Sequence, residues 1–259
     1  MPTTLLVGVS GPSSSGKTTL ARLLRDVFPN AFILHEDDFY KTDAEIPLKQ
    51  PDGIQDWDCL DALDLPGLRA ALAHIKARGA PPPDLVSKED QNAVGDAGRD
   101  VPAEAVSAWR ARAAALLDPA HGPAVVDRVA IVDGFLLYAE AMRDVRALFD
   151  VRLFLRASYG AAKARRETRN GYVTLEGFWE DPPGYVDKVV WPNYVRDHAF
   201  LFEGGDVHAR LDEGKCRELG IDGMPDDAQE SMARCLEWAC GVLHERLKEG
   251  VKSEEKGES

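Results

Sequence analysis

Short apolar runs recur along the chain and alternate with longer stretches of helical periodicity. Residues 5–9, 31–34 and 129–132 are short apolar runs bounded by polar or small residues, residues 151–155 form a similar run that contains Arg152, and residues 199–202 form a weaker run. Such runs are typical of strands that are buried on both faces of a parallel sheet. The pattern therefore predicts four central strands and a fifth candidate.

The segments between these runs carry helical patterns. Apolar residues recur at helical spacing from residue 17 to 27, and Pro29 ends this pattern. Residues 63–77, with Asp64 and Pro66 at cap and first-turn positions, are a second predicted helix. Residues 103–117 and 228–247 are two more. A strand, a helix and a second strand within residues 5–34 make a βαβ unit, which predicts an α/β fold with a mostly parallel sheet.

Two stretches interrupt this alternation. The first insertion covers about residues 79–128 and begins with a proline-rich, weakly patterned part at 79–98. The second covers residues 204–227 and is rich in glycine and acidic residues. We expect both to be surface excursions from one domain that spans residues 1–248, followed by a disordered, charged tail at 249–259.

The net charge and the cysteines limit which binding partners and which cellular compartment are expected. The formal net charge of -13 disfavours nucleic acid or an anionic membrane surface as a partner. The four cysteines form no C-x-x-C pair and are expected to be reduced thiols. No basic leader precedes the first apolar run, and no stretch reaches the length of a membrane span. A cytoplasmic or nuclear protein is expected, as a monomer or weak homodimer.

A phosphate-binding loop follows the first predicted strand. The segment from Gly11 to Thr18 matches G-x-x-x-x-G-K-[ST] completely and is followed by a predicted helix, which is the context that this motif requires. Lys17 would reach the outer phosphates of ATP and assist catalysis, and the Thr18 hydroxyl would ligate Mg²⁺. The candidate ATP-binding residues are Gly11, Ser13, Ser14, Ser15, Gly16, Lys17, Thr18 and Thr19. This motif predicts the P-loop NTPase fold, with three α/β/α layers and a small lid.

Acidic residues follow two of the predicted strands. The carboxyl ends of parallel strands face the ligand crevice, so Asp37, after the second strand, is the first candidate for a base that orients an attacking hydroxyl. Asp38 is the second candidate, and a capping role for this acidic pair stays open. Asp133 ends the third strand, where an acid commonly holds Mg²⁺.

A basic cluster follows the fourth predicted strand in an otherwise acidic chain. Guanidinium groups on a lid can stabilise the charge of a transferring phosphoryl group. Arg166 and Arg169 are the candidate catalytic arginines, and a solvated helix face is the alternative. The cluster consists of Lys163, Arg165, Arg166 and Arg169.

Five motifs together resemble nicotinamide riboside kinases, in a form that looks fungal. They are the phosphate loop, Glu36-Asp37-Asp38-Phe39-Tyr40-Lys41, Gln55-Asp56-Trp57-Asp58, Asp133-Gly134-Phe135-Leu136-Leu137 and Trp191-Pro192-Asn193-Tyr194. The resemblance implies transfer of the ATP γ-phosphoryl group to the 5′-hydroxyl of nicotinamide riboside, in NAD biosynthesis, on a fold similar to uridine and pantothenate kinases. It leaves nicotinic acid riboside open as a second acceptor.

The resemblance also implies roles for particular residues. Asp37 would be the general base, Asp58 would bind the ribose hydroxyls, and Trp57 and Tyr172 would be walls around the pyridine ring, with Tyr40 nearby. Aromatic faces attract a cationic ring. Three positions depart from the family pattern: Trp57 replaces a common tyrosine, Asp133 replaces a common glutamate, and Asn170-Gly171 adds a residue before Tyr172.

Two alternatives stay open at this point. One is a kinase of the same fold that acts on uridine, cytidine or a pantothenate-like alcohol. The other is a nucleotide-binding regulator that transfers nothing. The tetrapeptide N-K-x-D, with which GTPases read guanine, is absent from the sequence.

Overall fold

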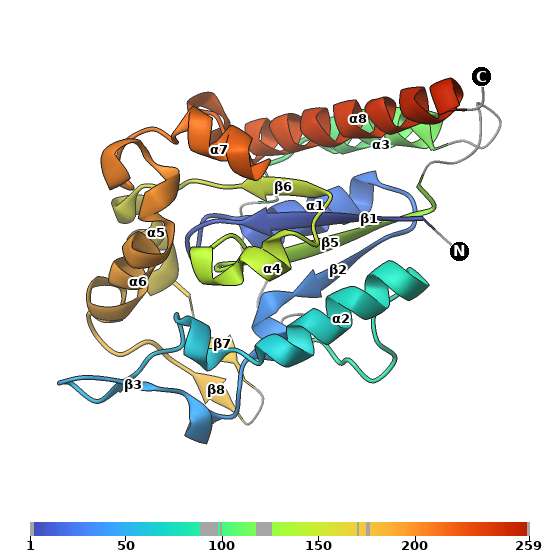
Figure 1. Cartoon of the computed structure of the whole chain (residues 1–259). Helices are drawn as coiled ribbons and strands as arrows, with labels where there is room; N and C mark the ends of the chain where they lie inside the picture. Colours follow the sequence, from blue (N-terminus) through green and yellow to red (C-terminus); the bar gives the residue numbers. More distant parts are fainter. Residues whose placement is uncertain are drawn as a thin grey trace.

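The protein has a three-layer α/β/α architecture around a parallel sheet (Figure 1). The computed structural model describes residues 3–88, 98, 100–117, 126–169, 171–174 and 177–257. The sheet has the order β2-β5-β1-β6-β9, and every pair in it is parallel. Its strands are β1 (Thr4–Ser10), β2 (Ala31–His35), β5 (Arg128–Gly134), β6 (Val151–Phe154) and β9 (Asp222–Gly223).

Eight α-helices and two small hairpins complete the described part of the chain. The helices are α1 (Lys17–Val27), α2 (Leu65–Arg78), α3 (Ala103–Leu116), α4 (Arg143–Arg146), α5 (Tyr159–Glu167), α6 (Trp191–His198), α7 (Glu213–Leu219) and α8 (Met232–Gly257). A π-helical segment, Val186–Val190, precedes α6. The hairpins pair β3 (Leu48–Lys49) with β4 (Ile54–Gln55) and β7 (Tyr172–Val173) with β8 (Phe178–Trp179). None of the described helices is both long and apolar enough to cross a bilayer.

Alternating side chains of the strands divide the core into two parts. Leu6 and Val132 point to one face, where α2 packs, whereas Val7 and Ile131 point to the other, where α1, α3 and α8 pack. All four side chains are fully buried. Burial on both faces explains why the strands are continuous apolar runs.

The four central strands are confirmed, as are the helices expected at residues 17–27, 63–77 and 103–117. Asp64 caps α2 as expected, since its Oδ1 accepts a hydrogen bond from the Gly67 backbone N–H at 3.0 Å. The helix expected at residues 228–247 begins instead at Met232. It extends to Gly257, past the boundary expected at residue 248.

The strand expected at residues 199–202 is wrong. Ala199–Leu201 form a 3-10 turn after α6, and Phe202 makes only an isolated bridge to Leu211. Leu201 and Phe202 are buried under this turn, so the apolar run reflects burial and not extension. Short apolar runs do not distinguish these two cases.

The second insertion is not a surface excursion. Between residues 204 and 227 it contains α7 and β9, and β9 pairs with the edge of β6. Cys216, Ile221 and Met224 from this segment are buried in the core. In the first insertion, α3 packs on α1 and α8, while residues 89–97, 99 and 118–125 lie outside the described residues. The four cysteines are free thiols, as the sequence predicts, and all four are buried.

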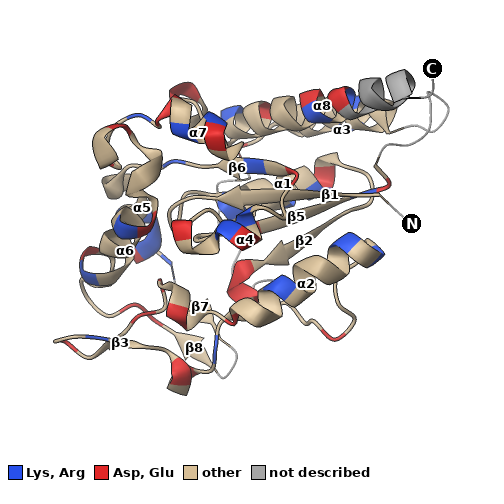
Figure 2. Cartoon of the chain, in the orientation of Figure 1, with Lys and Arg blue, Asp and Glu red and all other residues tan. Residues whose placement is uncertain are grey.

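The elements that surround the ligand crevice lie at one end of the sheet. Figure 1 shows α5, α6 and the β7–β8 hairpin at the end opposite the N-terminus. Figure 2 shows acidic residues gathered directly after β2 and basic residues on α5. The two charge signs predicted for the site are therefore on separate elements.

Candidate active site

The phosphate loop is folded between β1 and α1 by glycines at two strained positions. Gly16, the residue before α1, has a φ of 98°, in the left-handed region that favours glycine. Gly11 has a φ of 144°, and a Cβ there would lie 2.4 Å from the Leu155 carbonyl oxygen. The hydroxyls of Ser14 and Ser15 are buried without a partner in the described structure. Buried hydroxyls without partners are unfavourable, so the loop fits an anion that would satisfy them.

The ammonium group of Lys17 lies inside this loop. Its Nζ donates a hydrogen bond to the Pro12 carbonyl at 2.9 Å. Burial lowers the pKa of Lys17, and the neighbouring carboxylates of Asp37 and Asp133 oppose that shift. Lys17 is thus placed between the loop and the acidic strand ends.

Sheet register brings three side chains together at a possible metal position. His35 on β2 is directly beside Asp133 on β5, and its Nδ1 is 2.5 Å from Asp133 Oδ1. Thr18 donates from Oγ1 to Asp133 Oδ2 at 2.6 Å. Burial alone would raise the pKa of Asp133, but the interactions with His35 and Thr18 lower it. Asp133 is therefore held as a carboxylate.

Thr18 and Asp133 fit Mg²⁺ as partial ligands. Mg²⁺ prefers oxygen ligands and often takes one or two from the protein, with phosphate and water completing its shell. The described residues contain no cluster of three or more histidine, cysteine or acidic side chains suited to a metal. A cation held here would thus depend on the oxygens of a bound nucleotide.

The two acids after β2 have different surroundings. Asp37 lines the pocket described below and interacts electrostatically with Lys17. Asp38 instead accepts hydrogen bonds from Ser87 Oγ at 3.1 Å and from the Lys88 backbone N–H at 2.6 Å. Asp38 therefore anchors the segment that brings Lys88 to the pocket.

Glu36 is fully buried beneath this corner of the site. Its Oε2 accepts a hydrogen bond from the Leu136 backbone N–H at 3.0 Å. Burial raises the pKa of Glu36 to about 8, so the side chain is largely protonated at neutral pH. Glu36 fixes the turn after β5 that carries Phe135.

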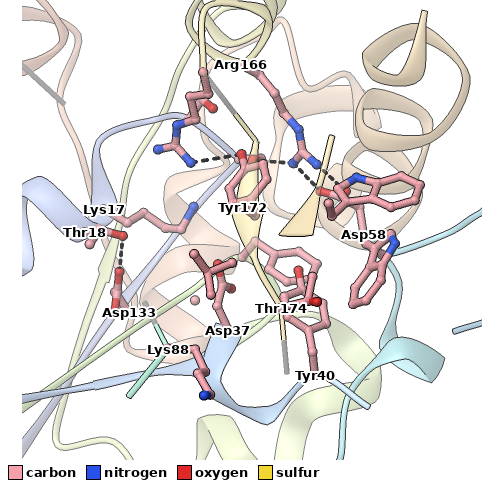
Figure 3. Close-up of a pocket in the computed structure, with 18 of the residues that line it drawn as sticks. Lys17, Thr18, Asp37, Tyr40, Asp58, Lys88, Asp133, Arg166, Tyr172 and Thr174 are labelled. Atoms are coloured by element: carbon pink, nitrogen blue, oxygen red, sulfur yellow. Dashed lines mark hydrogen bonds and ion pairs between the residues drawn. The ribbon is translucent and has the colours of Figure 1, made fainter. Parts of the chain in front are cut away.

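The basic cluster divides between several partners. Arg166 is buried and donates from Nη1 and Nη2 to the two oxygens of Asp58, at 2.9 and 3.0 Å. It also bonds Asp181 at 2.6 and 3.1 Å, and Ser13 Oγ at 2.8 Å. Arg169 donates to the Tyr172 hydroxyl at 2.9 Å. Figure 3 shows the contact between Arg166 and Asp58 above the pocket.

The other two basic residues lie further from the pocket interior. Arg165 reaches the Ser14 carbonyl at 3.4 Å. Lys163 pairs with Asp187 at 2.6 Å, and neither side chain lines the pocket. The cluster is therefore divided between the pocket, which Arg166 and Arg169 line, and its surroundings.

Aromatic side chains form the wall opposite the phosphate loop. Trp57 lies 5.4 Å from Tyr40 and 5.6 Å from Trp179 between ring centroids. Tyr40 stacks with Phe135 at 6.3 Å. Trp57 Nε1 is buried and has no partner in the described structure. A ligand with an acceptor atom could satisfy that donor.

The segment that carries Trp57 and Asp58 is held from behind. The Trp57 backbone N–H donates to the Tyr185 hydroxyl at 2.9 Å. Asn193 Nδ2 donates to Asp56 at 2.8 and 3.0 Å and to the Asp58 carbonyl at 3.0 Å. Trp191 packs among Tyr159, Tyr194 and His208.

The phosphate loop, the acids, the arginines and the aromatic wall line one pocket. Figure 3 shows Lys17, Thr18 and Asp133 on one side, Tyr40 and Asp58 on the other, and Asp37 between them. The lining residues are Ser13, Ser14, Gly16, Lys17, Thr18, Thr19, Asp37, Tyr40, Trp57, Asp58, Lys88, Asp133, Gly134, Phe135, Arg166, Arg169, Tyr172, Val173, Thr174 and Trp179.

Most candidate site residues meet in this pocket. Gly11 and Ser15 belong to the loop without lining it, and Asn170 lies outside the described residues. Six residues that the site uses were assigned no role from sequence patterns, although three of them stand in the quoted motifs or beside them. These six are His35, Glu36, Lys88, Phe135, Trp179 and Asp181.

The phosphate loop follows the central strand of a parallel sheet and faces an acid and an aromatic wall across one pocket. This arrangement defines a P-loop kinase for a small-molecule acceptor. A comparison with protein-family models gives no match. The chain is 43% identical over 208 residues to a nicotinamide riboside kinase of Schizosaccharomyces pombe, covering 80% of this chain and 85% of that protein. It belongs to the nicotinamide riboside kinase family.

Two further relatives carry the same name. The protein of Eremothecium gossypii is 42% identical over 208 residues, covering 80% of this chain and 81% of its own length. The protein of Saccharomyces cerevisiae is 36% identical over 238 residues, covering 91% and 94%. Among solved structures, a putative fructose transport system kinase from Silicibacter sp. is 23% identical, with a TM-score of 0.39 and coverage of 64% and 71%. That likeness is too low to support any conclusion.

Proposed function

We propose that this chain transfers the γ-phosphoryl group of ATP to the 5′-hydroxyl of nicotinamide riboside and so supplies the mononucleotide for NAD biosynthesis. The observation that carries this proposal is the position of Asp37. It lines the pocket between Lys17 on the phosphate side and Tyr40 on the aromatic side. The family membership agrees with it.

The donor side would bind the nucleotide phosphates through the loop backbone, the serine hydroxyls and Lys17. Mg²⁺, held by Thr18 and Asp133, would neutralise charge on the phosphates. Gly11 and Gly16 serve this side by allowing the loop backbone to close around the anion.

The acceptor side would bind the riboside by its ring and its sugar. Trp57, Tyr172 and Tyr40 offer aromatic faces to the cationic ring, and the carboxylate of Asp37 favours a positive occupant. Asp58 would bind the ribose hydroxyls. Both oxygens of Asp58 accept hydrogen bonds from Arg166. The ribose hydroxyls would therefore either share these oxygens with the guanidinium or displace it.

Catalysis would consist of positioning and charge stabilisation. Asp37 orients the 5′-hydroxyl and accepts its proton as the bond to phosphorus forms. Lys17, Arg166 and Arg169 surround the position of the transferring group and stabilise its negative charge. Arg166 on α5 and Arg169, which follows this helix, would also shield this position from water.

A panel of acceptors tests the proposal. Purified protein with Mg-ATP is assayed for ADP formation with nicotinamide riboside, nicotinic acid riboside, uridine, cytidine and pantothenate. We expect the largest kcat/KM for nicotinamide riboside. A larger kcat/KM for uridine or pantothenate would refute the substrate, and ATP binding without turnover of any acceptor would favour a regulator.

A further inference from the structure

The hairpin of β7 and β8 presents two aromatic side chains to the pocket. Tyr172 and Trp179 are directly opposite each other in the antiparallel register, and both line the pocket. Directly opposed residues project from the same face of a hairpin. Phe178, the residue before Trp179 on β8, is 61% exposed and does not line the pocket. The hairpin therefore directs one aromatic residue of β8 inward and its neighbour outward.

A hydrogen-bonded chain fixes the indole of Trp179. Its Nε1 donates to Asp181 Oδ1 at 2.9 Å. Asp181 in turn accepts two bonds from Arg166, at 2.6 and 3.1 Å. Since Arg166 is buried and also holds Asp58, the indole is tied to the acceptor side of the site.

The indole contributes a face at an angle to the wall already described. Its centroid lies 5.6 Å from that of Trp57, with an interplanar angle of 44°, and 5.7 Å from that of Tyr185, at 61°. The two tryptophans thus form a corner and not a closed stack, which leaves indole surface for a ligand. Asp58 lines the same side of the pocket, and its charge is paired with the Arg166 guanidinium.

We propose that Trp179 is a specificity-determining residue, whose indole face binds the positively charged ring of the acceptor. Tryptophan has the strongest cation–π attraction of the aromatic side chains. An uncharged ring of similar shape would gain only contact area from the same face. The inference rests on the proposed function, because it takes the cationic riboside as acceptor.

Two substitutions separate the aromatic face from the hydrogen bond to Asp181. Trp179→Phe keeps an aromatic face and removes Nε1, whereas Trp179→Leu removes both. Phe178→Leu, on the outward face, is the matched control. Dissociation constants are measured for nicotinamide riboside, for its uncharged dihydro form and for ATP, together with KM and kcat for the riboside.

We expect Trp179→Leu to weaken binding of the cationic riboside about 3- to 30-fold and to weaken binding of the dihydro form less. Trp179→Phe should weaken binding of the cationic riboside less than half as much as Trp179→Leu does. Phe178→Leu should bind both ligands as the wild type does. ATP affinity should stay unchanged in all three variants, which also reports that they fold.

Several results would overturn the inference. Equal losses for the cationic and dihydro ligands in Trp179→Leu would show that charge plays no part. Equal losses in the Phe and Leu variants would assign the effect to the Asp181 hydrogen bond. If the wild type fails to phosphorylate nicotinamide riboside, the proposed function itself fails, which the wild-type assay reveals separately from the variants.

Discussion

His35 and Asp133 lie side by side on neighbouring strands and are joined by a 2.5 Å contact between Nδ1 and Oδ1. The other oxygen of Asp133 accepts the Thr18 hydrogen bond at 2.6 Å. His35 is 2% exposed and does not line the pocket, and its contact with Asp133 connects it to the site. It belongs with the partners that orient metal ligands.

Removal of His35 should therefore weaken the magnesium dependence of nucleotide binding. We expect His35→Leu to lower the affinity for Mg-ATP about 10- to 100-fold, and to change the affinity for ATP without Mg²⁺ far less. His35→Asn, which can still donate to Asp133, should restore much of the loss. Calorimetric titration with and without Mg²⁺ measures both affinities.

His198 offers the matched control for that experiment. It is also buried, at 1% exposure, and bonds only the Tyr194 carbonyl among the contacts resolved in the described chain. His198→Leu should leave the ratio of the two affinities unchanged. A similar change of that ratio in both variants would contradict the role of His35.

Asp37→Asn should separate turnover from binding. The amide keeps the shape of the side chain but cannot accept the proton, so kcat should fall about 10²- to 10⁴-fold while ATP affinity is retained. Steady-state kinetics and nucleotide titration measure the two. Asp38→Asn, altered at a residue that anchors Lys88, should retain far more activity. An Asp37→Asn enzyme with wild-type kcat would remove Asp37 from the base role.

Loss of Arg166 should destabilise the fold because it leaves Asp58 and Asp181 without their cation. Breaking a buried ion pair from one side typically costs about 3–5 kcal/mol. We expect Arg166→Met to lower the free energy of unfolding by about that amount in urea denaturation. Arg169→Met, at an exposed side chain, should change it by about 0.5 kcal/mol or less. Comparable losses in both variants would refute the ion-pair explanation.

Glu36 should make stability depend on pH. Its pKa is about 8 in the folded protein and 4.5 as the ordinary value, so between these pH values the folded state holds a proton that the unfolded state releases. The contribution of Glu36 is complete below pH 4.5 and is lost as pH rises through 8. Glu36→Gln, which cannot ionise, should flatten this decline. The free energy of unfolding of the ligand-free protein is measured at pH 5, 6.5 and 8 for the wild type and for Glu36→Gln. If both proteins lose stability equally over this range, Glu36 is not the group responsible.

Local patterns predicted the parts of the site whose geometry is local. The phosphate loop is a contiguous motif, and Asp37 and Asp133 follow apolar runs that end at the same edge of the sheet. The class of fold follows from the same runs, because a strand, loop and helix in this order pack in few ways.

The remaining residues depend on contacts between distant segments. Trp179 and Asp181 gain their positions from a two-residue strand pair and from Arg166, which no periodicity encodes. Likewise β9 consists of Asp222 and Gly223, which carry no strand signal, and it exists because β6 offers a free edge. His35 and Asp133 each directly follow a predicted apolar run, but only the register between β2 and β5 brings them side by side.

One nitrogen of Arg166 connects the nucleotide side of the pocket with the acceptor side. Arg166 Nη1 donates both to Ser13 of the phosphate loop, at 2.8 Å, and to Asp58 on the acceptor side, at 2.9 Å. A nucleotide that draws this nitrogen towards the loop changes what Asp58 can offer the riboside, and the riboside acts on the loop in the same way. Nucleotide and riboside affinities are then linked by a coupling free energy, which thermodynamics requires to be equal in both directions.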